Sequence, residues 1–191
     1  MATKTAKKAA TLTVTELLHE DHLKVKDLFF QFTETESSDV KEQLVRQILT
    51  ELFIHATVEE EIVYPAVEEE ADDAEDLIDE AETEHHVVKV LMAELSKMTS
   101  QDDQFEAKVT VLCELVSHHI HEEEKEMFQK LRESDADLEE LAEQVQERKQ
   151  SLIGKPLPEM NVTLSIGSES KESNVRKVVA KNGKATQKKS A

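Results

Sequence analysis

The chain has 191 residues, with only 3 glycines, 3 prolines, no tryptophan and 4% aromatic residues. Turn-rich all-β folds need many glycine and proline residues in turns and many aromatic residues in strands, so this composition nearly excludes them. Charged residues make up 34% of the chain and hydrophobic residues 38%. That mixture is typical of long amphipathic helices with solvated outer faces, and it predicts an all-α protein.

The formal net charge of −19 is distributed unevenly along the chain. Residues 1–10 carry three lysines and residues 151–191 carry eight basic and three acidic side chains, so residues 11–150 hold a net charge of −27. A body of this charge repels nucleic acid and attracts cations. The lone Cys113 excludes an internal disulfide, and no apolar run approaches the ~20 residues that span a bilayer. The N-terminus lacks the apolar core of a secretory signal, so we expect a cytoplasmic protein without a membrane partner.

The spacing of apolar residues and polar turns predicts five helices, over residues 13–35, 39–69, 71–98, 103–133 and 137–152. Pro65 should kink or end the second of them. Four long helices joined by short turns favour an up-down-up-down bundle over residues 12–152, with a short fifth C-terminal helix. Residues 1–11 are expected to form a disordered segment, and residues 153–191 a flexible basic tail.

Polar residues interrupt the apolar face of the second predicted helix. Its inner line, in steps of three and four residues, reads Val45, Ile48, Leu52, His55, Glu59, Ile62 and Ala66. An ionised carboxylate in the interior of a bundle is costly unless it has a partner, and a cation bound by several side chains is one good partner. His55 lies one turn before Glu59 on the same face, so both side chains could address one ion.

The same intrusion recurs on every long helix. The inner faces carry four histidines and two glutamates, namely His22, His55, His85, His119, Glu59 and Glu123. With 42 acidic residues in the chain, His-x-x-x-Glu pairs also arise by chance, so the spacing alone is weak evidence. An internal repeat strengthens the case for a shared site in the bundle core. The run from His55 through Glu59 to Tyr64 recurs 64 residues later, and Asp21-His22 recurs 63 residues later as Glu84-His85.

Imidazole and carboxylate ligands suit first-row transition metals, and no thiolate is present to indicate a structural zinc site. Four histidines and two glutamates are the right number for two metal ions that share carboxylates. The ligand types favour two iron ions, with manganese or zinc as alternatives. The opposing interpretation is a metal-free bundle in which the same residues are buried and hydrogen-bonded to one another.

These residues resemble the hemerythrin-like, HHE cation-binding family over about residues 12–133. The resemblance rests on Asp21-His22, His55-Ala-Thr-Val-Glu59-Glu60, Glu84-His85 and His119-Ile-His-Glu-Glu123-Glu124. It implies a four-helix bundle around a non-haem di-iron centre. The implied terminal ligands are His22, His55, His85 and His119, and the implied bridging ligands are Glu59 and Glu123.

Two departures from the oxygen-carrying members argue against reversible oxygen storage. Those proteins place a second histidine four residues after the histidine of the third helix, where this chain has Lys89. They also tend to carry an aspartate five residues after the histidine of the fourth helix, where this chain has Glu123 four residues after His119. The resemblance is therefore to the broader HHE group, with its iron-, redox- and nitric-oxide-linked roles.

Two functions follow as hypotheses. The first is a di-iron protein that binds or reacts with O2, H2O2 or NO in a stress response or in sensing, and the alternative is a metal-binding structural or interaction module without turnover. No acid–base pair or nucleophile stands apart from the metal ligands, so no separate catalytic residue is expected. The tail has modest charge and no aromatic residue to stack on bases, which argues against a nucleic-acid partner. The sequence identifies no protein partner.

The sequence leaves two alternative roles for each of several neighbouring residues. His86 and His118 would replace His85 and His119 in a shifted register, and His19 is a fifth ligand or a hydrogen-bond donor to one. Glu60 and Glu124 point away from the core, as hydrogen-bond partners of ligands or as surface groups. Tyr64 is expected to pack the end of the bundle, with a hydrogen bond near the site as the alternative.

Overall fold

The computed structural model describes residues 12–71 and 73–158. The predicted N-terminal segment, residues 1–11, and most of the predicted tail, residues 159–191, lie outside the described residues, so their expected disorder stays a prediction. Within the described ranges all regular secondary structure is helical, which confirms the all-α class. None of the described helices is long and apolar enough to cross a membrane.

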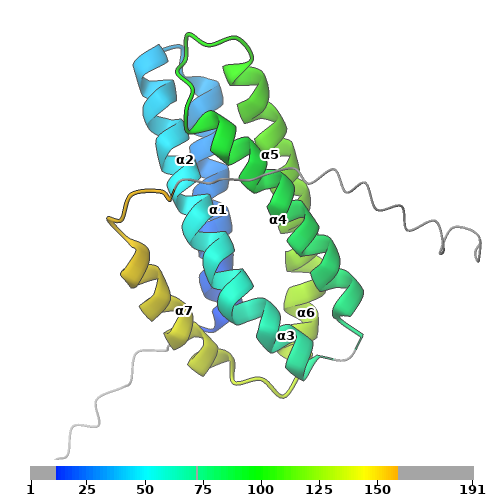
Figure 1. The fold of residues 1–191 in the computed structure, drawn as a ribbon. Coiled ribbons are helices and arrows are strands. Elements are labelled where there is room, and N and C mark those ends of the chain that lie inside the picture. Colours follow the sequence, from blue (N-terminus) through cyan, green and yellow to red (C-terminus); the bar gives the residue numbers. More distant parts are fainter. Residues whose placement is uncertain (1–11, 72, 159–191) are drawn as a thin grey trace, which may run out of the picture.

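The described part of the chain folds into nine consecutive helical elements. They are α1 (Val14–Glu34), α2 (Ser38–Val58), η1 (Glu59–Val63), α3 (Tyr64–Glu70), α4 (Glu75–Leu95), α5 (Phe105–Glu122), η2 (Glu123–Met127), α6 (Phe128–Glu133) and α7 (Leu138–Leu152). Two pairs of α-helices are joined end to end through the short η segments, so α2–η1–α3 and α5–η2–α6 are long continuous helices (Figure 1). With α1 and α4 they form the predicted four-helix bundle, and α7 packs beside α1 and α2 as the short fifth helix.

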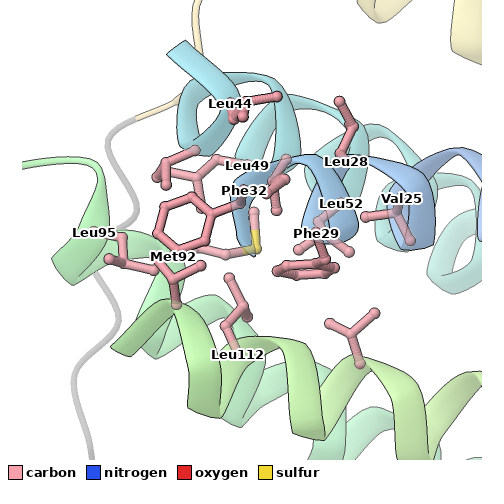
Figure 2. Close-up of a cluster of buried hydrophobic side chains, with 14 of the residues drawn as sticks. Val25, Leu28, Phe29, Phe32, Leu44, Leu49, Leu52, Met92, Leu95 and Leu112 are labelled. Carbon is pink, nitrogen blue, oxygen red and sulfur yellow. The ribbon is translucent and has the colours of Figure 1, made fainter. Parts of the chain in front are cut away.

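The apolar core is divided into two clusters along the bundle axis. The first cluster joins the C-terminal half of α1 with α2, α4 and α5. Figure 2 shows its side chains, among them Phe29, Met92 and Leu112, pointing toward one another. The second cluster joins the starts of α1 and α4 and the end of α2 to η1, α3, η2, α6 and α7, with Leu18, Tyr64 and Leu131 almost fully buried. Each long helix passes through both clusters. The stretch between them is therefore dry, and the polar intrusions of the sequence fall there.

The η segments are π-helical turns, each beginning at one of the two inner glutamates. The backbone N–H of Tyr64 donates to the carbonyl of Glu59, and that of Phe128 donates to the carbonyl of Glu123, five residues back instead of four. Such single π turns occur frequently at functional sites. Each turn accommodates one extra residue and therefore rotates the rest of the helix.

The rotation corrects the predicted inner line of the second long helix. Ile62 and Ala66 were expected on the inner face, but both are only half-buried, whereas Val63 and Val67 are fully buried. The expectation assumed an uninterrupted 3.6-residue period, and the π turn shifts the buried face by one residue beyond Glu59.

Pro65 does not end the helix, which excludes one of the two outcomes that were predicted for it. It lies in the first turn of α3, and the helix continues to Glu70. A proline is tolerated at the start of a helical segment because its missing N–H is not needed there. The π turn at Glu123 contains no proline, and Gln129 occupies the repeat position of Pro65. The π geometry is therefore independent of the proline.

Helix α7 depends on its N-cap. The Asp137 carboxylate accepts hydrogen bonds from the backbone N–H groups of Glu139 and Glu140. We expect Asp137→Ala to lower the free energy of unfolding by about 1 kcal/mol, as N-cap removal usually does, and Asp137→Asn to leave it nearly unchanged. Urea denaturation followed by circular dichroism measures the difference. An unchanged midpoint in the alanine variant would mean that α7 does not unfold together with the bundle.

Candidate metal centre

The six predicted ligands meet in the dry middle of the bundle. All six are buried, and they comprise one histidine from each long helix and two glutamates: His22, His55, His85, His119, Glu59 and Glu123. We call His22 and His55 the first histidine pair, His85 and His119 the second histidine pair, and Glu59 and Glu123 the inner carboxylates. Each glutamate opens a π turn one turn after a histidine of its own helix.

The first histidine pair faces both inner carboxylates. The Nε2 atoms of His22 and His55 lie 3.1 Å apart. His55 Nε2 lies 3.0 Å from Oε1 of Glu59, and His22 Nε2 lies 3.3 Å from Oε2 of Glu123. These four ligand atoms all lie within 4.8 Å of one another, as the donors of one metal ion would.

The second histidine pair repeats the arrangement. The Nε2 atoms of His85 and His119 also lie 3.1 Å apart. His85 Nε2 is 3.5 Å from Oε2 of Glu59, and His119 Nε2 is 3.5 Å from Oε2 of Glu123. Glu59 thus offers one oxygen to each histidine pair, and Glu123 lies between the pairs with one oxygen near both. Both inner carboxylates are placed to bridge two ions.

Three of the four oxygens of the inner carboxylates have no hydrogen-bond donor among the described residues. Both oxygens of Glu59 and Oε2 of Glu123 accept no hydrogen bond from the residues that the structure describes, although histidine nitrogens lie 3.0–3.5 Å away. Leaving a buried charged oxygen without a hydrogen bond is costly. Separations of this size are those of ligand atoms that share a metal ion at about 2.1 Å. The residues therefore fit a pair of first-row metal ions.

A second layer of acids fixes the histidine rings. We call Asp21, Glu60, Glu84 and Glu124 the outer carboxylates. The Nδ1 atoms face them in the pairs His22–Glu124 (2.9 Å), His85–Glu60 (2.8 Å), His119–Glu84 (2.8 Å) and His55–Asp21 (3.4 Å). An acceptor at Nδ1 holds that nitrogen protonated and turns Nε2 toward the metal. The sequence repeat therefore extends beyond the ligands to the acids that orient them.

The remaining histidines stay outside the centre. His86 is exposed, and so is His118 beside Glu122, so neither replaces a ligand through a shifted register. His19 is also exposed and reaches Oε1 of Glu124 at 3.0 Å, which makes it a neighbour of an outer carboxylate and not a fifth ligand. Lys89, four residues after His85, donates to Oε1 of Glu60 at 2.6 Å. That position therefore forms an outer ion pair.

The charged groups of the centre shift one another's pKa values. Burial by itself lowers the pKa of His55, but the charges of Glu59 and Glu123 and the hydrogen bond to Asp21 outweigh it and raise the pKa to about 10. The pKa of His119 is raised for similar reasons, against its burial. Burial alone would raise the pKa of Glu123, but the surrounding imidazoles, led by His119, hold it at about 2. The imidazoles of His55 and His119 and the carboxylate of Glu123 thus stabilise one another's charged forms.

The two histidine pairs differ in their aromatic neighbour. The Tyr64 hydroxyl lies 3.2 Å from Nε2 of His85 and donates to Oε1 of Glu123 at 3.4 Å, whereas its repeat counterpart Phe128 stacks on His22 with ring centres 5.7 Å apart. Tyr64 therefore contacts the centre, which was the stated alternative, while its ring also packs in the second apolar cluster. The rotation of the π turn carries it there. Burial and the inner carboxylates raise the pKa of Tyr64 well above its ordinary value, so the phenol remains a hydrogen-bond donor.

Removing this hydroxyl tests its role. We expect Tyr64→Phe to keep both metal ions, because the six ligands are intact, and to lower the free energy of unfolding of the metal-free protein by about 1 kcal/mol through the lost hydrogen bond to Glu123. Elemental analysis gives the metal content and urea unfolding gives the stability. Loss of one metal ion in this variant would instead make the phenol oxygen a ligand.

Comparisons with known proteins agree with this geometry. A family model described as the hemerythrin HHE cation-binding domain matches residues 13–131. A solved hemerythrin HHE cation-binding domain-containing protein from Mycobacterium kansasii superimposes with a TM-score of 0.63 at 28% identity, over 74% of this chain and 87% of that one.

A second comparison finds a relative by its sequence. A protein of Nostoc sp. (strain PCC 7120) named DNA nickase is 26% identical over 123 residues. The match covers 63% of this chain and 34% of the relative, so the chain spans about a third of that protein's length. The match to the family model covers more than half of the chain and includes every residue of the six-ligand centre. The chain therefore belongs to the hemerythrin HHE cation-binding domain family.

Proposed function

We propose that this protein holds two iron ions between its inner carboxylates and its two histidine pairs, and that it binds or reacts with a small oxidant, O2, H2O2 or NO, in an iron- or redox-linked response. The nitrogen and oxygen donors and the two bridging positions support this assignment. Manganese and zinc accept the same donors, so metal analysis is part of the test.

A small apolar cavity beside the centre carries the proposal. It touches three ligands, His55, His85 and His119, and about 20 Å³ of it can hold the centre of a water molecule. Asp21 and Glu51 also line it, together with six apolar side chains, namely Val25, Leu52, Ala56, Val88, Val116 and Ile120. One water needs roughly 10–15 Å³ by this measure, so the cavity has room for a molecule of two or three non-hydrogen atoms. Its apolar wall favours an uncharged guest.

The protein's own residues prepare the site for such a guest. The outer carboxylates hold the histidine rings, the inner carboxylates neutralise the bound ions, and the two apolar clusters exclude water. The Tyr64 hydroxyl keeps a proton directed at Glu123. Bound iron supplies electrons and an open coordination position when the centre is loaded.

The test uses the full chain, loaded anaerobically with ferrous iron and mixed with H2O2 or NO. We expect new absorption bands from the loaded protein and none from the metal-free protein. Ala56→Leu should fill the cavity, retain both ions and slow the reaction at least about tenfold, an effect that requires only ~1.4 kcal/mol. A loaded protein that remains inert toward both reagents would support the alternative, a metal-binding module without turnover.

A further inference from the structure

We propose a third cation site on the surface of the bundle, formed by Glu84 of α4 with His118 and Glu122 of α5, which takes a divalent transition-metal ion of the zinc class. It uses none of the six residues of the central site. It therefore stands independently of the proposed reaction with an oxidant.

The geometry of the three side chains is that of a ligand set. His118 Nε2 lies 3.3 Å from Oε1 of Glu122 and 3.7 Å from Oε1 of Glu84, and the three atoms all lie within 4.8 Å of one another. Tetrahedral zinc with ligands at about 2.1 Å separates its ligand atoms by about 3.4 Å. One nitrogen and two carboxylate oxygens suit this class of ion. The His118 side chain is 59% exposed, which leaves a fourth position to water.

The internal repeat supplies an independent observation. Glu84 is the repeat counterpart of Asp21, and each lies behind one ligand histidine, Glu84 behind His119 and Asp21 behind His55. The ammonium of Lys149 contacts both oxygens of Asp21, at 2.6 Å for Oδ2. Both members of this ion pair are more than four-fifths buried. A fixed ammonium therefore stands behind His55, as that of Lys89 stands behind His85 through Glu60.

Lys149 comes from α7, which lies outside the repeat and packs on α1, α2 and η1. The second histidine pair has no equivalent of that helix within residues 12–158, and the ion-pair partners found there for Glu84 are the imidazoles of His119 and His118. Glu84 keeps one oxygen on His119 and turns the other toward His118 and Glu122. A metal ion bound there would occupy the place that the Lys149 ammonium occupies in the other half.

A superficially similar group does not meet the same conditions. His19 and Glu124 also meet at the surface, but that group has a single carboxylate, whereas the proposed site has two, and the ammonium of Lys26 already lies 3.8 Å from Glu124. Its third donor is Nδ1 of His22, a ring whose other nitrogen faces the central site. Glu84, behind His119, is therefore the outer carboxylate whose negative charge an added cation would balance.

The experiment titrates Zn²⁺ into the full-length metal-free chain by isothermal calorimetry, with elemental analysis of the dialysed protein. We expect three ions in the unaltered chain, two tightly bound and one weaker. His118→Ala and Glu122→Gln should each bind two, whereas His121→Ala, an exposed histidine of the same helix, should bind three. Circular dichroism verifies that the fold is retained in each variant.

A charge replacement sharpens the test. Glu122→Lys places an ammonium beside Glu84 and should bind two ions, with the central pair retained as in the unaltered chain. Two ions in the unaltered chain, or three in His118→Ala, would overturn the proposal. The central site is tested separately: a chain that binds a single ion, lost in His118→Ala, would support the surface site and contradict the two-metal centre.

Discussion

Glu59→Gln is expected to reduce the metal content from two ions to less than one. Glu59 offers one oxygen to each histidine pair, so both ions depend on it. An amide is neutral and carries one oxygen, so it cannot bridge two cations, whereas its shape matches that of the glutamate it replaces. The metal-free variant should therefore fold, because the substitution removes a buried charge whose oxygens accept no hydrogen bond from the described residues.

The measurement is elemental analysis after expression in iron-replete medium and dialysis. Glu61→Gln is the matched control, because Glu61 lies in the same π turn but is exposed and pairs with Arg148 through its carboxylate. The control should retain both ions. A Glu59→Gln protein that still carries two ions would show that the carboxylate is not the bridge. The unaltered protein should also gain about 4 kcal/mol of stability at a metal concentration 1,000 times the Kd.

Metal binding near pH 7 is expected to release protons, and the metal affinity should rise with pH up to about 10. His55 has a pKa of about 10 in the metal-free protein, so it is protonated at neutral pH and must lose that proton to bind a metal ion. Each proton released makes the apparent affinity increase about tenfold per pH unit below the pKa. Calorimetry in buffers of different ionisation enthalpy counts the protons.

The stability of the metal-free protein should also depend on pH, through His55 and Glu123. For His55 the dependence is opposite to that of the metal affinity, because stability falls as the pH rises. The raised pKa of His55 gives stabilisation that is complete below its unfolded pKa of about 6.5 and is lost as the pH rises toward about 10. The lowered pKa of Glu123 gives stabilisation that is complete above about 4.3 and is lost as the pH falls toward about 2. Urea midpoints should therefore be highest between about pH 4.3 and about pH 6.5, where both contributions are complete. Metal binding without proton release, or a midpoint that keeps rising above pH 7, would contradict the assignment for His55, and a midpoint that does not fall between about pH 4 and about pH 2 would contradict the assignment for Glu123.

The burial of the six residues of the candidate centre could be predicted because each breaks a strong local pattern. A histidine on an apolar helical face is visible from the sequence, and so is its recurrence after 63 or 64 residues. The bundle followed from the same periodicity. The two π turns were not predictable, because the choice between bonding four or five residues back at Glu59 depends on what the rest of the bundle buries. That choice moved Val63 and Tyr64 inward, against the expected line.

Partners that are distant in the sequence were also missed. The pairing of Glu124 with His22 joins residues at opposite ends of the bundle sequence, and only packing brings them together. Lys149 could not be connected with Asp21 because its helix has no counterpart in the repeat. Local pattern thus predicted which side chains point inward, and tertiary contacts decided which acid supports which histidine.

The position of α7 has a consequence for any attempt to transplant or trim this protein. The matched family region ends at residue 131, seven residues before α7 begins. A fragment cut at that border would uncover the apolar wall that Leu141, Ala142 and Val145 close, and would leave Asp21 without its ammonium. We therefore expect a fragment that folds by itself to extend to about residue 152, beyond the end of the matched family region.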